Sequence, residues 1–351
     1  MENINFLQTK DFFSLNALKC LRNEYLFNDC QLCFERCSYN ALGIFKNKIK
    51  LFEELCTSCG ACIGVCPTES LSLSTFDMSA FIFNFLEKEV NQIIEKMDIP
   101  HFGMLDSYHL ISLVLRSKRN LFLQFDENNS SKDLDYIESQ IKQSNLFLSS
   151  IGVEHSLFLK PHVSELQNNS RRHLFKTLVQ AKNGLQQNSS VSQKLTQEQK
   201  TLPAKVTLFK NSLKLVCEDI VNTQISTQDL PLYNQKIDFQ RCTNCVECIT
   251  FCPTNALFQS ATKESIYFQS GKCIGCNICH QVCQHNAIQE EKNLDLIAFM
   301  FDKAELLVKF EYIKCDECNN MFIHKNQGTV CDVCKDYAYN HNNMFTLAKD
   351  L

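Results

Sequence analysis

The chain has 351 residues, a formal net charge of -4 and 21 cysteines. This length allows two or three domains, and the small negative charge excludes a globally basic surface of the kind that attracts nucleic acid. The first ten residues have no secretory signal pattern, and no stretch reaches the roughly eighteen apolar residues of a membrane span, so we expect a cytoplasmic protein without direct membrane insertion. In a reducing compartment, closely spaced thiols indicate metal ligands rather than disulfides.

The N-terminal region, residues 1–75, is predicted to be a metal-binding module. A run Cys-x2-Cys-x2-Cys-x3-Cys-Pro begins at Cys56, and a shorter run Cys-x2-Cys-x3-Cys begins at Cys30. Phe27 stands where the shorter run would have its first cysteine. Cys20, which lies upstream, is the candidate for the missing ligand. The alternative is a three-ligand site in which Cys20 is an ordinary buried thiol.

The middle region, residues 76–183, is predicted to be a small α/β domain with a connecting helix. Apolar periodicity predicts helices over residues 104–118 and 133–151, and strands over residues 120–125 and 156–160. Strands that alternate with helices favour a parallel sheet. The sequence contains no GxGxxG or GxxxxGK[ST] motif, so nothing indicates a nucleotide site.

The amino-acid composition changes after the middle region, which ends at residue 183. Residues 184–200 are rich in Gln, Asn and Ser and are predicted to be a solvated linker. Residues 201–236 are expected to form connecting strands, with Cys217 as a core residue in an apolar, strand-like run. Residues 237–292 are predicted to be a second metal-binding module, because two regular four-cysteine runs begin at Cys242 and Cys273.

The tail, residues 293–351, contains two Cys-x2-Cys knuckles separated by twelve residues. This spacing resembles a zinc ribbon, and we expect a structural metal site there. Tetrahedral coordination by four sulfurs suits zinc and also a single iron, as in rubredoxin. We expect zinc, and a single iron is the alternative. The expected ligands are Cys315, Cys318, Cys331 and Cys334.

A six-residue unit recurs four times, at residues 37–42, 66–71, 252–257 and 283–288. Each unit begins with the last cysteine of a run and ends with a small residue followed by an aliphatic one. The four units occur as two pairs, which predicts two tandem modules. Zinc would be the alternative metal for these runs, but four-thiolate zinc sites usually show two separated knuckles.

The runs closely resemble those of the bacterial-type dicluster ferredoxin family, over residues 29–71 and 238–288. In that family three cysteines of a run bind one 4Fe-4S cluster and the fourth binds the other cluster. The resemblance therefore implies four clusters. For the N-terminal module it implies one cluster on Cys56, Cys59, Cys62 and Cys37, with the other on Cys20, Cys30, Cys33 and Cys66. For the C-terminal module it implies one cluster on Cys242, Cys245, Cys248 and Cys283, with the other on Cys273, Cys276, Cys279 and Cys252.

A further resemblance concerns the turn Gly103-Met104-Leu105 and the elements after it, over roughly residues 99–160. These are similar to a small α/β domain in iron-sulfur proteins associated with formate dehydrogenases and hydrogenases. Cysteines that such domains often carry are absent from the matching positions here. The resemblance therefore implies a docking or scaffold role for this domain.

Together these patterns predict an α+β protein with two dicluster modules flanking a small α/β domain and a zinc-ribbon-like tail. We expect an electron carrier or electron-transfer subunit with up to four 4Fe-4S clusters and no catalytic activity of its own. Its partner would be a redox enzyme or another electron-carrier protein, and nucleic acid is excluded as a partner. The alternative is an accessory or assembly protein of a formate dehydrogenase or hydrogenase complex.

Overall fold

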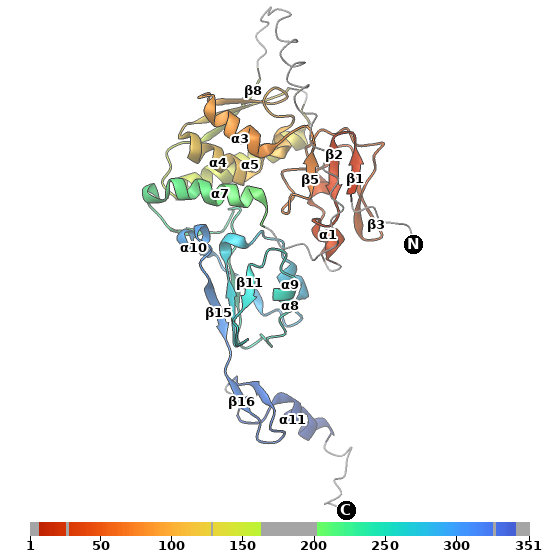
Figure 1. Ribbon diagram of the computed structural model, residues 1–351, viewed down its shortest axis with the longest axis vertical. Coiled ribbons are helices and arrows are strands. Elements are labelled where there is room, and N and C mark those ends of the chain that lie inside the picture. The colour runs from red at the N-terminus through yellow and green to blue at the C-terminus, as the bar shows by residue number, and fades with distance from the viewer. Residues whose placement is uncertain (1–6, 26–27, 128, 163–201, 326–327, 342–351) are drawn as a thin grey trace, which may run out of the picture.

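The computed structural model describes residues 7–25, 28–127, 129–162, 202–325 and 328–341. The N-terminal module and the α/β domain lie side by side at one end of the long axis, the C-terminal module follows them, and the tail forms the other end (Figure 1). The predicted linker over residues 184–200 and Phe27 lie outside the described residues.

The N-terminal module combines short antiparallel strands with two helices of one turn or slightly more. A three-stranded sheet has the order β1-β2-β5, and a separate hairpin pairs β3 with β4. The alternation along β2 buries Phe13 and Leu15 in the core. The elements are β1 (Leu7–Lys10), β2 (Phe13–Asn16), α1 (Leu21–Glu24), α2 (Leu32–Arg36), β3 (Leu42–Phe45), β4 (Lys48–Leu51) and β5 (Leu71–Leu73).

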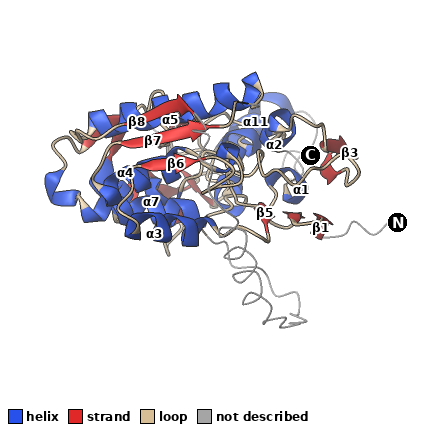
Figure 2. Ribbon diagram, turned by 90° about the horizontal axis from the view of Figure 1, so that it is seen from above, coloured by secondary structure: helices blue, strands red, loops and turns tan. Residues whose placement is uncertain are grey.

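The middle domain contains a parallel sheet with the order β6-β7-β8, as predicted. Its three strands lie side by side in the view of Figure 2. The helix expected from residue 104 begins at Ser107, because residues 102–104 form a 3-10 turn and Asp106 caps the helix by accepting from the backbone N–H of His109. The elements are α3 (Met78–Glu87), β6 (Gln92–Ile94), η1 (Phe102–Met104), α4 (Ser107–Ser117), β7 (Leu121–Phe125), α5 (Ser131–Ser150) and β8 (Leu157–Pro161).

The expectation of connecting strands over residues 201–236 was wrong for the first part of that segment. Residues Ala204–Leu215 form the helix α7, which packs against α4. Val206, Phe209 and Leu213 are fully buried, and their spacing of three and four residues is helical. Cys217 does not lie in a strand: it begins the 3-10 turn η2 (Cys217–Asp219) and is half-buried at the edge of the core. A short strand, β9 (Gln224–Ser226), follows.

The C-terminal module extends beyond the predicted boundary at residue 292. The strand β15 pairs with β12, and β14 pairs with β9, so the chain up to Lys309 belongs to this module. The remaining tail is a hairpin followed by short helical turns. The module's elements are β10 (Gln235–Ile237), α8 (Glu247–Thr250), β11 (Leu257–Gln259), β12 (Ser265–Phe268), η3 (Ser270–Lys272), α9 (Ile278–Val282), β13 (Ile288–Glu290), β14 (Asn293–Asp295), α10 (Leu296–Met300) and β15 (Glu305–Lys309); those of the tail are β16 (Tyr312–Lys314), β17 (Met321–Ile323), α11 (Asp332–Asp336) and the π-helical turn η4 (Tyr337–His341).

One hydrophobic core runs through the N-terminal module, the α/β domain, α7 and α10, while most of the C-terminal module has a second core of its own. Ile274, in the second run of the C-terminal module, belongs to the first core. The cysteine-bearing loops are therefore held from several sides by packed elements. Within the described residues, no helix is both long enough and apolar enough to cross a membrane.

Candidate metal centres

Three of the cysteine runs share one loop conformation around their second cysteine. The residue before it and the residue after it both have positive φ; the pairs are Ser58 with Gly60, Asn244 with Val246, and Gly275 with Asn277. Backbone of alternating handedness turns successive N–H groups toward one point, and such nests are found at many iron-sulfur sites. The first N-terminal run departs from this pattern, since no residue from 28 to 37, all of which are described, has positive φ.

The last cysteine of every run is followed by the same turn. The third residue after the cysteine has positive φ, and the backbone N–H of the fourth residue donates to the cysteine sulfur, at 3.4 Å in the first repeat and 3.2 Å in the other three. The left-handed residues are Asn40, Glu69, Asn255 and Asn286. Asparagine adopts this conformation more readily than most residues. The six-residue repeat is therefore a structural unit that directs a backbone donor at a cysteine sulfur.

The N-terminal module brings eight thiols together in two groups. Burial, with the neighbouring thiols of Cys66 and Cys30, raises the pKa of Cys20 to about 11. Burial also raises the pKa of Cys33, and the thiols of Cys66, Cys20 and Cys30 add to this shift. We call Cys20, Cys30, Cys33 and Cys66 the inner N-terminal group. Burial is likewise the main cause of the raised pKa of Cys62; among neighbouring thiols Cys33 of the inner group contributes most, followed by Cys59, Cys37 and Cys56. With Cys62, the last three complete the second group. We call these four the outer N-terminal group.

The C-terminal module has two equivalent groups. Burial, with the thiols of Cys242, Cys245 and Cys283, raises the pKa of Cys248 to about 12; these four form the outer C-terminal group. Burial and the thiols of Cys273, Cys276 and Cys252 raise the pKa of Cys279; these four form the inner C-terminal group. Three of the four groups join the first three cysteines of one run with the last cysteine of another, as the ferredoxin resemblance implies. The inner N-terminal group has Cys20, from outside the runs, together with Cys30, Cys33 and the last cysteine of the other run, Cys66.

The spacing of the thiols separates these groups from a site for a single ion. Among the described residues, the cysteines of the tail form the only group of three or more metal-ligating side chains whose ligand atoms all lie within 4.8 Å of one another. The four groups in the modules are more open. In a four-iron cluster each thiolate binds a different iron atom, so its four sulfurs need not converge on one point.

The tail places Cys315, Cys318, Cys331 and Cys334 around one point. The Sγ atoms of Cys315 and Cys334 are 3.9 Å apart, and those of Cys318 and Cys331 are 3.8 Å apart. Four sulfurs at about 2.3 Å from a central metal in a tetrahedron are about 3.8 Å from one another. This group can therefore hold one metal ion, and zinc and a single iron both fit the four-sulfur donor set.

A buried ion pair supports the loop of Cys66. Lys205, on α7, lies 2.7 Å from Asp106 and donates to the backbone carbonyls of Gly64 at 3.1 Å and Cys66 at 2.8 Å. Burial alone would raise the pKa of Asp106, but the charges of Lys205 and His109 hold it well below its usual value. The ion pair therefore fixes α7 and the α/β domain to the cysteine loop.

The α/β domain also contacts this loop through backbone. The N–H of Gly64 donates to the carbonyl of Gly103 at 3.0 Å. A Cβ atom on Gly103 would lie 2.5 Å from the carbonyl oxygen of Ala61, a separation that real side chains do not adopt. The turn Gly103-Met104-Leu105 that the sequence singled out is thus a packing surface for the loop between Cys59 and Cys66.

Sequence reasoning missed Lys205 and Asp106. The two residues are 99 positions apart along the chain, so no local spacing connects them. The only local signal was Asp106 itself, at the position of a helix cap.

The model of a 4Fe-4S binding domain matches this chain twice, at residues 49–72 and 266–289. These segments contain the second run of each module.

An archaeal-type glutamate synthase (NADPH) of Thermotoga maritima is 32% identical over 56 residues, which are 16% of this chain and 11% of that protein. An uncharacterized ferredoxin of Methanocaldococcus jannaschii is 37% identical over 54 residues, 15% of this chain and 37% of the ferredoxin. The chain thus covers well under half the length of these relatives, and what it shares with them is confined to about 55 residues. The chain therefore contains two 4Fe-4S binding domains.

Proposed function

We propose that this chain carries four 4Fe-4S clusters, one on each of the four thiol groups, and passes single electrons to and from a redox partner. The observation that carries the proposal is the grouping of sixteen cysteines into four sets of four, each of which includes the last cysteine of another run. Clusters held by four thiolates exchange one electron at a time without breaking or forming a bond to substrate.

The chain's own residues have three tasks in this function. Thiols bind iron as thiolates, so metal binding releases their protons; burial raises the pKa of ten of the sixteen thiols in the free protein, among them Cys20 and Cys273. The backbone donors of the four repeats stabilise the charge on the ligand sulfurs. The apolar cores around the inner groups restrict access of water, which helps to set the reduction potentials.

Anaerobic reduction followed by optical and electron paramagnetic resonance spectroscopy tests the proposal. Reduction should reversibly bleach the broad sulfur-to-iron absorbance and produce resonances of reduced four-iron clusters. Absorbance that does not change reversibly with added reductant would contradict an electron-transfer role.

For the tail we propose a structural zinc ion. The tail contacts the first run of the C-terminal module: Asn244 donates to the Tyr312 hydroxyl at 2.8 Å, and Lys325 donates to the carbonyl of Gln240 at 2.8 Å. The small hairpin has little core of its own, and a metal ion would hold it in place against the module. Metal analysis of the purified protein distinguishes zinc from a single iron.

The partner in this proposal is a redox enzyme or electron-carrier protein. The resemblance of the α/β domain suggests a formate dehydrogenase or hydrogenase, with this chain as an electron-transfer subunit. The assembly alternative differs in its partner: it requires transient binding to the enzyme before its cofactors are inserted. Purification of the tagged chain under anaerobic conditions separates the two, because a stable stoichiometric complex with a loaded enzyme supports the subunit and exclusive binding to the cofactor-free enzyme supports assembly.

A further inference from the structure

The two metal-binding modules touch each other through the loops of their inner thiol groups. Leu21, which follows Cys20, packs in a small buried cluster with Ile278 and Val282 of α9. Cys30 and Cys276 lie at the edge of the same cluster. Residues more than 250 positions apart thus form one interface, and both sides of it bear cysteines of the inner groups.

Asn28 connects the two loops by hydrogen bonds. Its side-chain oxygen accepts from the backbone N–H of Cys30 at 3.1 Å, and its side-chain nitrogen donates to the carbonyl of Cys276 at 3.3 Å. Only 3% of Asn28 is exposed. Next to it, the side chain of Gln281 donates to Asp29 at 2.8 Å. A buried amide that satisfies both loops fixes their separation, because leaving its polar atoms without partners would be costly.

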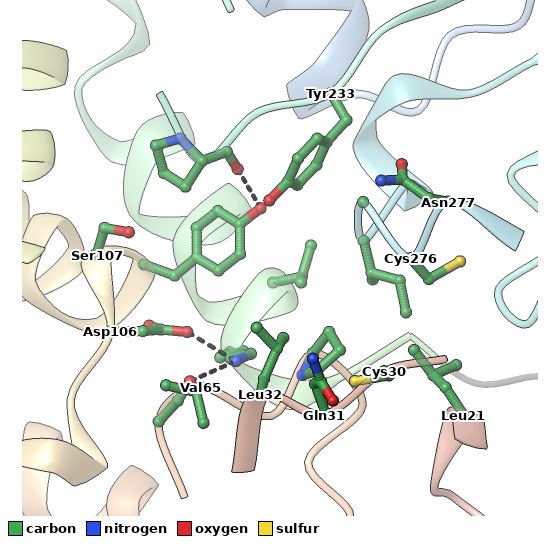
Figure 3. A pocket seen from close by; sticks show the side chains of 18 of the residues that line it. Leu21, Cys30, Gln31, Leu32, Val65, Asp106, Ser107, Tyr233, Cys276 and Asn277 are labelled. Atoms are coloured by element: carbon green, nitrogen blue, oxygen red, sulfur yellow. Dashed lines mark hydrogen bonds and ion pairs between the residues drawn. The ribbon is translucent and has the colours of Figure 1, made fainter. Parts of the chain in front are cut away.

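The inner groups also face a common cavity. Cys30 and Cys276 line this cavity of about 440 Å³, with Cys30 on one wall and Cys276 on another (Figure 3). Within each module the inner and outer groups share a core: Cys33 packs against the core that contains Cys62, and Cys279 packs against the core that contains Cys248, where α8 and α9 are in contact.

We propose that the four clusters form one continuous electron path, which crosses from module to module between the inner groups at Asn28. The order is the outer N-terminal, inner N-terminal, inner C-terminal and outer C-terminal group. This inference rests on the proposed function. Each step is a one-electron exchange: one cluster is oxidised as its neighbour is reduced, and no proton or group moves with the electron.

The path has its most accessible end at the outer C-terminal group. Of the sixteen cysteines of the modules, all of them described, only Cys245 of this group is exposed. The contact between the inner groups is what distinguishes one path from two independent diclusters.

Pulse radiolysis of the fully loaded protein tests the path. A pulse that delivers less than one electron per molecule reduces the exposed clusters first, and redistribution is then followed optically and by rapid-freeze electron paramagnetic resonance. A continuous path gives redistribution across all four clusters at a rate that does not depend on protein concentration. Cys276→Ala should abolish the part of this phase that crosses between modules.

Asn28→Ala keeps every cysteine and provides the second variant. It should leave iron and sulfide contents unchanged and slow the crossing phase. The matched control is Asn23→Ala, which removes hydrogen bonds to Ile49 within the N-terminal module and does not touch the junction; its crossing phase should equal that of the unmodified protein. Loaded modules that exchange electrons only in a concentration-dependent phase, or an Asn28→Ala rate equal to that of the control, would overturn the path. Lack of reducible clusters would instead overturn the proposed function.

Discussion

The two modules hold their thiols in the same arrangement but achieve it by different means. In the C-terminal module both runs are regular, both have the paired left-handed residues, and neighbouring strands of the same half of the chain support them. In the N-terminal module the first run lacks this pair within the described residues, and its group includes Cys20, from just before α1. Distant segments support the loop that supplies the fourth cysteine of this group, Cys66: Lys205 from α7 donates to its carbonyl, and Gly103 from the α/β domain accepts from Gly64. A group whose first run has an incomplete local pattern is thus held in part by tertiary contacts to its other loop.

This comparison predicts that the N-terminal clusters are the more sensitive to substitutions far away in sequence. Lys205→Met should have the largest effect, because it leaves Asp106 buried without its main partner, at a cost of about 3–5 kcal/mol in the free energy of unfolding. It also removes the donor to the carbonyls of Gly64 and Cys66. Denaturant unfolding and iron analysis should show lower stability and roughly half the iron of the unmodified protein.

Lys210→Met is the matched control on the same helix. Lys210 pairs with Asp302, whose side chain is 32% exposed and can be solvated when the lysine is removed. The expected cost is about 1 kcal/mol or less, with no loss of iron. Equal effects of the two substitutions would show that α7 matters only for general stability and has no special link to the N-terminal clusters.

Gly103→Ala should have the next largest effect. The new methyl group would meet the backbone of Ala61, which cannot move aside without shifting the cysteine loop. Overpacking of this kind costs about 1–3 kcal/mol, and we expect partial loss of the N-terminal clusters while those of the C-terminal module persist. The control is Gly43→Ala, which lies in the N-terminal module itself. Its new methyl group meets only the ring of Phe52, a side chain that can rotate away. A normal cluster content in Gly103→Ala would contradict a supporting role for the α/β domain.

Cys20→Ala should affect one cluster. If Cys20 is the fourth ligand of the inner N-terminal group, the substitution leaves one iron without a thiolate, and air exposure should convert that cluster to a three-iron form with a resonance in the oxidised state. Cys217→Ala is the control, since Cys217 belongs to none of the five thiol groups. Identical iron content and spectra in the two variants would remove Cys20 from the ligand set.

The smallest effect on the clusters is expected from Cys318→Ser in the tail. This variant should lose one metal ion per chain and leave the iron-sulfur absorbance almost unchanged, because the tail contacts the module through hydrogen bonds to a loop and the packing of Ile323, and it contributes no thiol to the outer C-terminal group. Metal analysis and limited proteolysis measure both consequences. A loss of absorbance comparable to that of Cys20→Ala would show that the tail supports the outer cluster directly.

The sequence predicted the parts of the sites that depend on local spacing. The cysteine runs, the four repeats and the knuckles of the tail are short-range patterns; the structure places the four thiols of the tail around one point and gives every repeat the same turn, while the ligand sets of the four clusters stay a prediction. Other features depend on contacts between distant segments. Asn28 has no local pattern that marks it as a bridge, and the strand prediction around residues 201–236 failed because an apolar run at this length does not distinguish a buried helix. Val246 is left-handed although β-branched residues avoid this region, which indicates that the surrounding loop imposes the conformation.

The central claim is that the sixteen cysteines of the modules hold four four-iron clusters and the tail holds a different kind of site. Iron, acid-labile sulfide and zinc, determined together on anaerobically purified protein, test it most directly. The account predicts about sixteen iron and sixteen sulfide per chain with one zinc. Zinc in place of iron throughout, without labile sulfide, would contradict it.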